Sequence, residues 1–165
     1  QFKQEQVSLE ELLKKSCVTL LIPVELRGQE LRIHADGAFR GDLSWTCEAI
    51  GNIVKNCMEH TLKGGRIEID AAENALYSEI IIKDNGTGIS PEDLPHIFER
   101  FYRSDKARNR TTTQSGVGIG LSILYQIVEA YRCRIDVSSE LGVGTRFDLY
   151  IPFADRETTT PQLEL

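Results

Sequence analysis

Two stretches of alternating apolar and polar residues constrain the fold of this chain most strongly. The first, RIEIDAAENALYSEIIIKD (residues 66–84), alternates along two runs that meet near Asn74, which predicts a β-hairpin. The second, CRIDVSSELGVGTRFDLYIPF (residues 133–153), predicts another hairpin with its turn at Leu141–Gly144. Strands joined by such short turns pair antiparallel, so we expect a largely antiparallel sheet.

Segments with helical spacing stand before and between these hairpins. Ser8 is expected to cap a helix over LEELLKKSCVTLL, with Glu11 completing a capping box and Pro23 kinking or ending the helix. A long helix with one apolar stripe is predicted from about Asp42 to Thr61. The remaining predicted elements are short strands in ELRIHA and AFRGD, a short helix in PEDLPHIFERFYR that Ser90 caps and Pro91 begins, and a helix in VGIGLSILYQIVEAYR.

The chain is expected to form one domain. Its 165 residues suffice for a real core, and its apolar and charged fractions, 41% and 27%, are ordinary for a soluble globular protein. The order of elements predicts an α/β fold: a two-layer sandwich with a mixed, mainly antiparallel sheet and about three helices on one face. We expect residues 1–8, which open with the polar QFKQEQ, to be a linker or the end of an upstream helix. Residues 9–153 would form the domain and residues 154–165 a disordered tail.

Charge, hydropathy and cysteine usage argue against several classes of protein. The net charge is −6 and no basic run stands out, which disfavours a nucleic-acid binder. No stretch approaches about 18 apolar residues and no signal peptide opens the chain, so neither a membrane span nor direct membrane contact is expected. Four cysteines without a CxxC pattern predict buried free thiols in a reducing compartment, the cytoplasm: Cys17, Cys47, Cys57 and Cys133.

The predicted helix over residues 42–61 carries a polar ridge. Glu48, Asn52 and Asn56 recur every four residues and therefore share one face. Asparagine is a mediocre helix former, so two of them in register carry a local cost. Two interpretations stay open on these residues alone. The ridge is either a solvated polar face or an oxygen-rich site for a hard cation such as Mg²⁺, which binds few protein ligands together with phosphate oxygens.

The glycine loop KDNGTGIS follows the apolar run IIIK, which places Asp84 at the end of a buried strand. A simple turn accounts for D-x-G-x-G about as well as a binding site does. A carboxylate at an apolar strand end needs a partner, however, and the exocyclic amine of adenine is a suitable one. Gly86 and Gly88 would then let the backbone approach a flat base.

A second glycine loop, SGVGIGLS, opens a predicted helix. Gly116, Gly118 and Gly120 would expose backbone N–H groups at the electropositive start of that helix, which favours a polyphosphate guest. The pattern is not the Rossmann fingerprint, because a loop and not a strand precedes it. It is not a P-loop, because no Gly-Lys-Ser/Thr follows.

The segment between the two loops, residues 91–115, is expected to act as a mobile lid. Phe98 and Phe101 are three residues apart and can anchor one face, while Arg100 and Arg103 can project toward phosphate. An ordinary amphipathic turn with solvated arginines is the alternative. The stretch SDKARNRTTTQS is polar and lacks periodicity, as expected of a flexible loop.

The order of these features resembles that of bacterial two-component sensor histidine kinases. An asparagine-bearing helix, D-x-G-x-G, F-x-x-F and G-x-G-x-G resemble the N, G1, F and G2 boxes of that family, and the resemblance extends from about Ser8 to Phe153. It implies the Bergerat-type fold of the HATPase_c or GHKL superfamily, which also includes type II topoisomerases, heat-shock chaperones and mismatch-repair proteins. It also implies ATP and Mg²⁺ as cofactors and a lid that closes over the triphosphate.

The resemblance assigns roles to individual residues. Asn56 would bind Mg²⁺, Asp84 would accept a hydrogen bond from the adenine amino group, and Arg103 would approach the terminal phosphate, so that Asn56 and Arg103 are the expected catalytic residues. Thr145 would reach the base through water. The full set of expected cofactor-binding residues is Asn52, Lys55, Asn56, His60, Asp84, Gly86, Gly88, Ile89, Phe101, Arg103, Gly116, Val117, Gly118, Gly120, Leu121 and Thr145.

Two departures from the family pattern bear on function. Many members carry Lys-Tyr where this chain has Glu59-His60, so an acid replaces a phosphate-binding lysine, and Lys55, Arg100 or Lys106 would have to compensate. The phosphoacceptor pattern, His followed by an acid and then Thr-Pro or Arg-Pro, is also missing, since none of the three histidines fits it: His34, His60 and His96. We therefore expect an ATP-binding catalytic domain that acts on a histidine of a separate dimerisation domain of its parent, for relay to a response regulator. The parent is expected to be anchored in the bacterial cell membrane.

Three other functions remain as alternatives at this point. A hydrolytic machine of the topoisomerase or chaperone type would carry a water-activating glutamate one turn before the Mg²⁺ asparagine, where this chain has Asn52. Glu48 lies two turns back, about 12 Å along the axis, too far to replace it. A serine kinase of the anti-sigma type and a nucleotide-sensing pseudokinase are the other two. The long lid and the F-x-x-F pattern disfavour the serine kinase. The intact Asn56, Asp84 and glycine loops disfavour the pseudokinase, but Glu59 keeps that alternative open.

Overall fold

The computed structural model of the protein describes residues 5–99 and 116–153, and for residues 116–120 it describes the backbone only. The predictions made for Phe101 and Arg103, for the rest of residues 100–115 and for the C-terminal tail lie outside these described residues.

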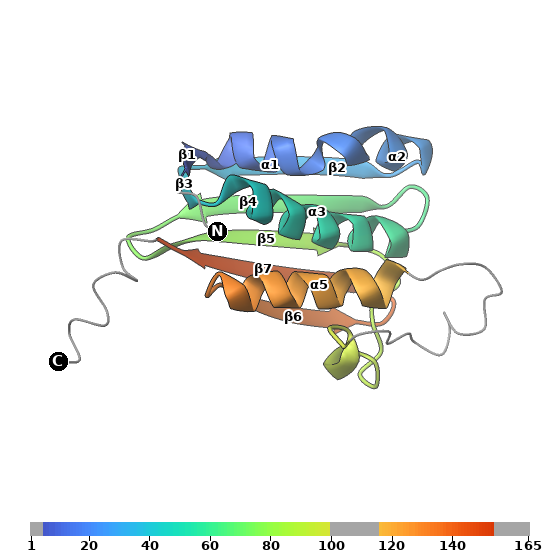
Figure 1. Cartoon of the computed structure of the whole chain (residues 1–165). Coiled ribbons are helices and arrows are strands. Elements are labelled where there is room, and N and C mark those ends of the chain that lie inside the picture. Colours follow the sequence, from blue (N-terminus) through green and yellow to red (C-terminus); the bar gives the residue numbers. More distant parts are fainter. Residues whose placement is uncertain (1–4, 100–115, 154–165) are drawn as a thin grey trace.

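A layer of helices covers one face of a sheet (Figure 1). The helices are α1 (Leu9–Cys17), α2 (Leu21–Leu26), α3 (Leu43–His60) and α5 (Gly116–Ala130), with 3₁₀ turns η1 (Val18–Leu20) and η2 (Leu94–His96). The strands are β1 (Glu5–Ser8), β2 (Glu30–Asp36), β3 (Ala38–Gly41), β4 (Arg66–Glu73), β5 (Tyr77–Asp84), β6 (Arg134–Glu140) and β7 (Gly144–Pro152).

The main sheet has five strands in the order β2-β4-β5-β7-β6. Its one parallel pair is β2 with β4, and the other neighbours pair antiparallel. The chain crosses from β2 to β4 through β3 and α3, and such a crossover is what a parallel pair requires. Both predicted hairpins and the mixed, mainly antiparallel sheet with helices on one face are confirmed.

The core lies between the sheet and the helices. β5 alternates strictly between half-buried and buried residues, so Ile80 and Ile82 point inward and are fully buried. Ile67 of β4 and Phe147 of β7 face the same layer, and Ile53 of α3 packs from above, each without exposed surface. The opposite face of the sheet carries charge pairs within single strands, such as Arg146 with Asp148 at 2.9 Å, as expected of a face open to solvent.

The first residues of the described chain differ from the prediction. Glu5–Ser8 form strand β1, which pairs antiparallel with β3, so Glu5 and Gln6 are not the end of a helix. Pairing with β3 overrides the polar composition, because the backbone groups of β3 offer hydrogen-bond partners. Ser8 caps α1 as predicted, with its hydroxyl accepting from the Glu11 N–H at 3.0 Å.

The first helix breaks earlier than predicted. α1 ends at Cys17 and α2 begins at Leu21, so the kink precedes Pro23. The physical reason is that an early break places Pro23 in the first turn of α2. In that turn N–H groups have no intrahelical partner, so the missing N–H of proline costs little.

The predicted helix that begins at Pro91 is wrong for the described residues. Ser90 does cap this segment, because its hydroxyl accepts from the Asp93 N–H at 3.1 Å. Only the 3₁₀ turn Leu94–His96 follows, and Pro95 lies in its middle. A proline there removes one backbone donor and disfavours an α-helix. No helix among the described residues is both long enough and apolar enough to span a bilayer.

Candidate functional site

The polar ridge of α3 runs from solvent into the molecule. Asp42 caps the helix by accepting from the Trp45 N–H at 3.1 Å, and Glu5 of β1 accepts from the Leu43 N–H at 3.0 Å. Along the helix Glu48 is exposed, Asn52 is half-buried and Asn56 is buried, with 6% of its surface exposed. The amide of Asn56 therefore lies at the inner end of the ridge, where a buried polar group costs free energy unless it has a hydrogen-bond or metal partner.

Asp84 occupies the predicted position at the end of a buried strand. It is the last residue of β5 and is directly paired with Thr145 of β7. Its Oδ1 accepts from the Gly86 N–H at 2.9 Å and from the Thr145 N–H at 3.3 Å. These two bonds fix the carboxylate in place with 9% of its surface exposed. A charged acceptor held in this way is preorganised for a ligand donor.

The first glycine loop is packed against the end of α3. A Cβ at Gly86 would lie 2.1 Å from the His60 carbonyl oxygen, so only glycine fits there. The same carbonyl accepts from the Thr87 N–H at 3.0 Å. Glycine thus brings the helix that carries Asn56 against the loop that follows Asp84, which joins two predicted parts of one site.

The same loop also packs against the turn between β6 and β7. Gly88 has a φ of 79°, and a Cβ there would lie 2.3 Å from the Glu140 carbonyl oxygen. The Gly142 N–H donates to the Thr87 carbonyl at 2.9 Å. The loop is therefore held on both sides, by α3 and by the second hairpin.

A pair of hydroxyl groups lies next to this loop. The hydroxyls of Ser139 and Thr145 are 2.7 Å apart, and Ser139 Oγ accepts from the Ile89 N–H at 2.7 Å. Ile89 and Thr145 were predicted for the site, but Ser139 was missed. Its only signal is its place in the alternation of β6, which puts it on the same face as Val137.

The second glycine loop begins α5 at the same end of the molecule. In Figure 1 the N-terminus of α5 lies beside the C-terminus of α3 and the end of β5. Gly116–Gly120 form the first turn of this helix, so its free N–H groups lie at that end, while Leu121 is buried in the core. The Phe98 and Tyr125 rings have centroids 5.4 Å apart, so the segment after the first loop is anchored on α5.

The end of α3 also carries ionisable groups whose pKa values are shifted. Burial raises the pKa of the Glu59 carboxyl, and the positive charges of Lys55 and Arg27 hold back part of that rise. Burial also raises the pKa of the Cys57 thiol, and the nearby carboxylate of Asp84 adds to it. Sequence reasoning did not connect Cys57 with Asp84 or Arg27 with Glu59, because these pairs form only in the fold.

The structure thus brings most of the predicted residues to one end of the sheet. Asn56, His60, Asp84, Gly86 and the residues around them meet where α3, β5, β7 and the start of α5 converge (Figure 1). Lys55 lies on the exposed side of α3 and Asn52 one turn before Asn56. The roles of Phe101 and Arg103, and of the side chain of Val117, lie outside the described residues.

Comparisons with known proteins agree with this architecture. The family of histidine kinase-, DNA gyrase B- and HSP90-like ATPases (HATPase_c) matches residues 41–155. Sensor protein SrrB of Staphylococcus aureus is 40% identical over 111 residues, which are 67% of this chain and 19% of SrrB. The chain thus spans about a fifth of the length of this curated relative.

Two solved structures share the fold. Full-length ShkA, in complex with AMPPNP, superimposes with a TM-score of 0.79 at 23% identity, over 93% of this chain and 32% of that chain. Histidine kinase ThkA, in complex with the response regulator protein TrrA, has a TM-score of 0.75 at 19% identity, over 94% of this chain and 43% of that chain. The chain belongs to the histidine kinase-, DNA gyrase B- and HSP90-like ATPase family, as an ATP-binding catalytic domain of the sensor histidine kinase type.

Proposed function

We propose that this domain binds ATP with Mg²⁺ and transfers the γ-phosphoryl group to a histidine on a separate helical domain of its parent protein. The observation that carries this proposal is the buried carboxylate of Asp84, fixed at a strand end and flanked by a glycine loop. A carboxylate suits the base end of the nucleotide, because the adenine amino group donates there and no phosphate approaches.

At the base end, Asp84 would accept from the adenine amino group while its Oδ1 keeps the two backbone bonds. Gly86 and Gly88 let this loop pack directly against α3 and the second hairpin, which holds the backbone after Asp84 in place. The hydroxyl of Thr145, paired with Ser139, would reach the base through a water molecule. These contacts would read adenine through hydrogen bonds and exclude a base that lacks the amino donor at that position.

At the phosphate end, the amide oxygen of Asn56 is the proposed Mg²⁺ ligand. The donor fits the ion, because Mg²⁺ prefers oxygen ligands and takes few of them from the protein. When bound, the ion would neutralise charge on the phosphate oxygens. Asn52 would lie beside the phosphates, and the N–H groups at the start of α5 would donate to them.

The proposed reaction is an in-line phosphoryl transfer. A nitrogen of the acceptor imidazole attacks the γ-phosphorus, and the bond to the bridging oxygen breaks. ADP then leaves with that electron pair. The domain contributes positioning and charge neutralisation, which dominate catalysis of this reaction class. Arg103, which lies outside the described residues, is the proposed contact to the terminal phosphate.

ATP hydrolysis is the less favoured reaction. Asn52 holds the position one turn before Asn56, and an amide cannot act as the general base for water. Glu48 is exposed and a further turn away. We further propose that the phosphoryl group passes from the histidine to a response regulator, and that the domain works on the cytoplasmic side of a membrane-anchored parent.

The adenine assignment is tested by calorimetry on Asp84→Asn. The amide oxygen of asparagine can still accept from Gly86 and Thr145, so the fold should persist while the charged acceptor is lost. We expect ATP affinity to fall about 10- to 100-fold, as for a lost charge-assisted hydrogen bond. Wild-type affinity in a folded Asp84→Asn protein would refute the assignment. Asp70→Asn, which makes the same substitution at an exposed position on the open face of β4, is the control.

A further inference from the structure

An acid lies near the end of the site where phosphate is proposed to bind. Glu59 is on the last turn of α3, three residues after Asn56, and is half-buried. A carboxylate in this position repels a triphosphate unless its charge is compensated. The structure supplies two cations that act on it, one from the same helix and one from a distant part of the chain.

The first cation is Lys55, one helical turn before Glu59. Side chains four residues apart lie on the same face of a helix, so Lys55 and Glu59 are neighbours. Lys55 is exposed and follows Val54 of the core face, so its ammonium group lies at the helix surface beside the asparagine ridge.

The second cation is Arg27, which follows the end of α2. The segment after it is fastened to the end of α3 by the buried side chain of Gln29. Gln29 Nε2 donates to the Met58 carbonyl at 2.9 Å and to the Thr61 carbonyl at 2.6 Å. The Gly64 N–H adds a bond to the Gly28 carbonyl at 2.7 Å. These bonds hold the segment that directly follows Arg27 against the turn of α3 that carries Glu59.

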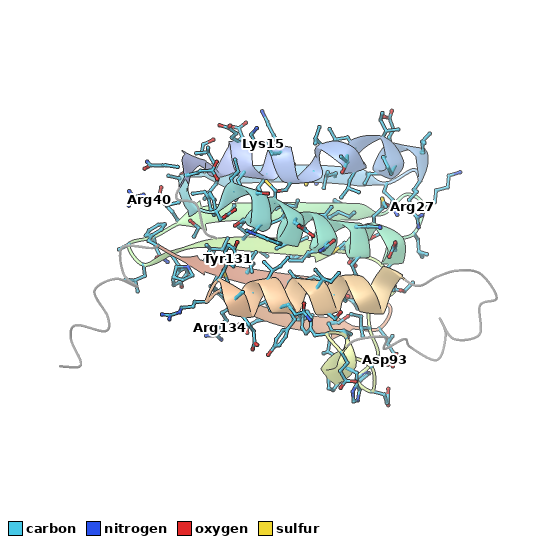
Figure 2. The ribbon with its side chains drawn as sticks, viewed as in Figure 1. Lys15, Arg27, Arg40, Asp93, Tyr131 and Arg134 are labelled. Atoms are coloured by element: carbon cyan, nitrogen blue, oxygen red, sulfur yellow. The ribbon has the colours of Figure 1, made fainter. Side chains whose placement is uncertain are left out.

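Figure 2 shows Arg27 at the same end of the molecule as the C-terminus of α3 and the start of α5. Both Arg27 and Lys55 act on the Glu59 carboxyl, since each lowers its pKa against the effect of burial. We call Arg27, Lys55 and Glu59 the charge cluster, and with Glu59 ionised their charges sum to +1.

We propose that Arg27 and Lys55 compensate Glu59, and that Arg27 is thereby a further determinant of triphosphate affinity. The proposal rests on the proposed ATP binding and extends it to a residue outside the four sequence boxes. Removing Arg27 leaves the cluster neutral, whereas removing the charge of Glu59 leaves it doubly positive. The two substitutions should therefore change ATP affinity in opposite directions.

The test is calorimetry with ATP and with adenosine on Arg27→Gln, Glu59→Gln and the double variant, all with Mg²⁺ at low salt. We expect Arg27→Gln to weaken ATP binding about fivefold and Glu59→Gln to strengthen it by about the same factor. The double variant should bind ATP within about twofold of wild type. Adenosine affinity should stay unchanged in all three, and the ATP effects should shrink at high salt.

Arg134→Gln is the matched control, because Arg134 is exposed and lies at the opposite end of the molecule in Figure 2. The inference is overturned if Arg27→Gln leaves ATP affinity unchanged, if it weakens ATP and adenosine equally, or if Glu59→Gln weakens ATP. It is also overturned if the double variant binds as weakly as Arg27→Gln. If the wild-type chain fails to bind ATP at all, the proposed function itself is wrong.

Discussion

At the scale of single residues, burial decides which side chains are chemically distinctive. Asp84 and Asn56 are both polar and both nearly excluded from solvent. Each carries a group that a ligand can satisfy, and Asp84 is already held by two backbone donors. Glu48 shares the ridge with Asn56 but remains exposed, so the same residue spacing gives very different environments.

Glu59 yields a prediction about stability and pH. Because its pKa is raised in the folded state, its contribution to stability is present below the ordinary pKa of 4.5 and is lost as the pH rises through the raised value. Glu59→Gln removes this loss. We therefore expect the variant to be more stable than wild type at pH 7 and equal to it near pH 4, as measured by urea midpoints.

The control for this prediction is Glu48→Gln, which neutralises an exposed acid on the same helix. It should leave the midpoint nearly unchanged at both pH values, as surface substitutions usually do. A Glu59→Gln protein that is less stable than wild type at pH 7 would show that the attraction of Lys55 and Arg27 outweighs the cost of burial.

At the scale of elements, close backbone contacts between the glycine loop, α3 and the second hairpin assemble the site. Gly88 and Gly142 provide a matched test, because both have a φ of 79°. A Cβ at Gly88 would collide with the Glu140 carbonyl, whereas a Cβ at Gly142 meets nothing within 4 Å. The strain of the left-handed backbone, about 1–2 kcal/mol, is thus common to both alanine variants.

We expect Gly142→Ala to lose only that strain energy and to keep its nucleotide affinity. Gly88→Ala should lose more stability and most of its ATP affinity, because the loop must move away from the second hairpin. Urea unfolding and calorimetry on the two variants measure this difference. Equal losses in both would show that the close approach at Gly88 does not matter.

Sequence reasoning predicted the elements well where one local signal dominated. The hairpins follow from the alternation of apolar and polar residues, and the extent of α3 follows from its apolar stripe. It was wrong where a tertiary contact or a proline decided the outcome. Strand β1 exists because β3 is available to pair with it, and Pro95 limits the segment after Ser90 to a 3₁₀ turn.

For the candidate site too, the sequence predicted the residues that form a local pattern and missed those that depend on tertiary contacts. Asp84, Gly86 and Gly88 form a local pattern that sequence alone reveals. Ser139 and Arg27 carry no such pattern, because the first acts through a cross-strand partner and the second through the Gln29 contact with α3. Contacts between distant parts of the chain become visible only in the fold.

At the scale of the whole molecule, the sheet and the helices direct all the candidate groups to one end. β5 and β7 bring Asp84 opposite Thr145, α3 ends beside them, and α5 begins there (Figure 1). Strand β1 lies at the opposite end, where its Glu5 accepts a hydrogen bond from the first residue of α3. The proposed nucleotide site thus lies at one end of a continuous scaffold.

Phosphoryl transfer tests the central claim most directly. The domain is mixed with γ-labelled ATP, Mg²⁺ and the purified helical domain of its parent that carries the acceptor histidine. We expect acid-labile label on that histidine with the wild-type chain, and almost none with Asp84→Asn or Asn56→Ala. No label should appear on the chain alone. Stable labelling of the isolated chain, or no transfer to any histidine domain despite ATP binding, would contradict the account.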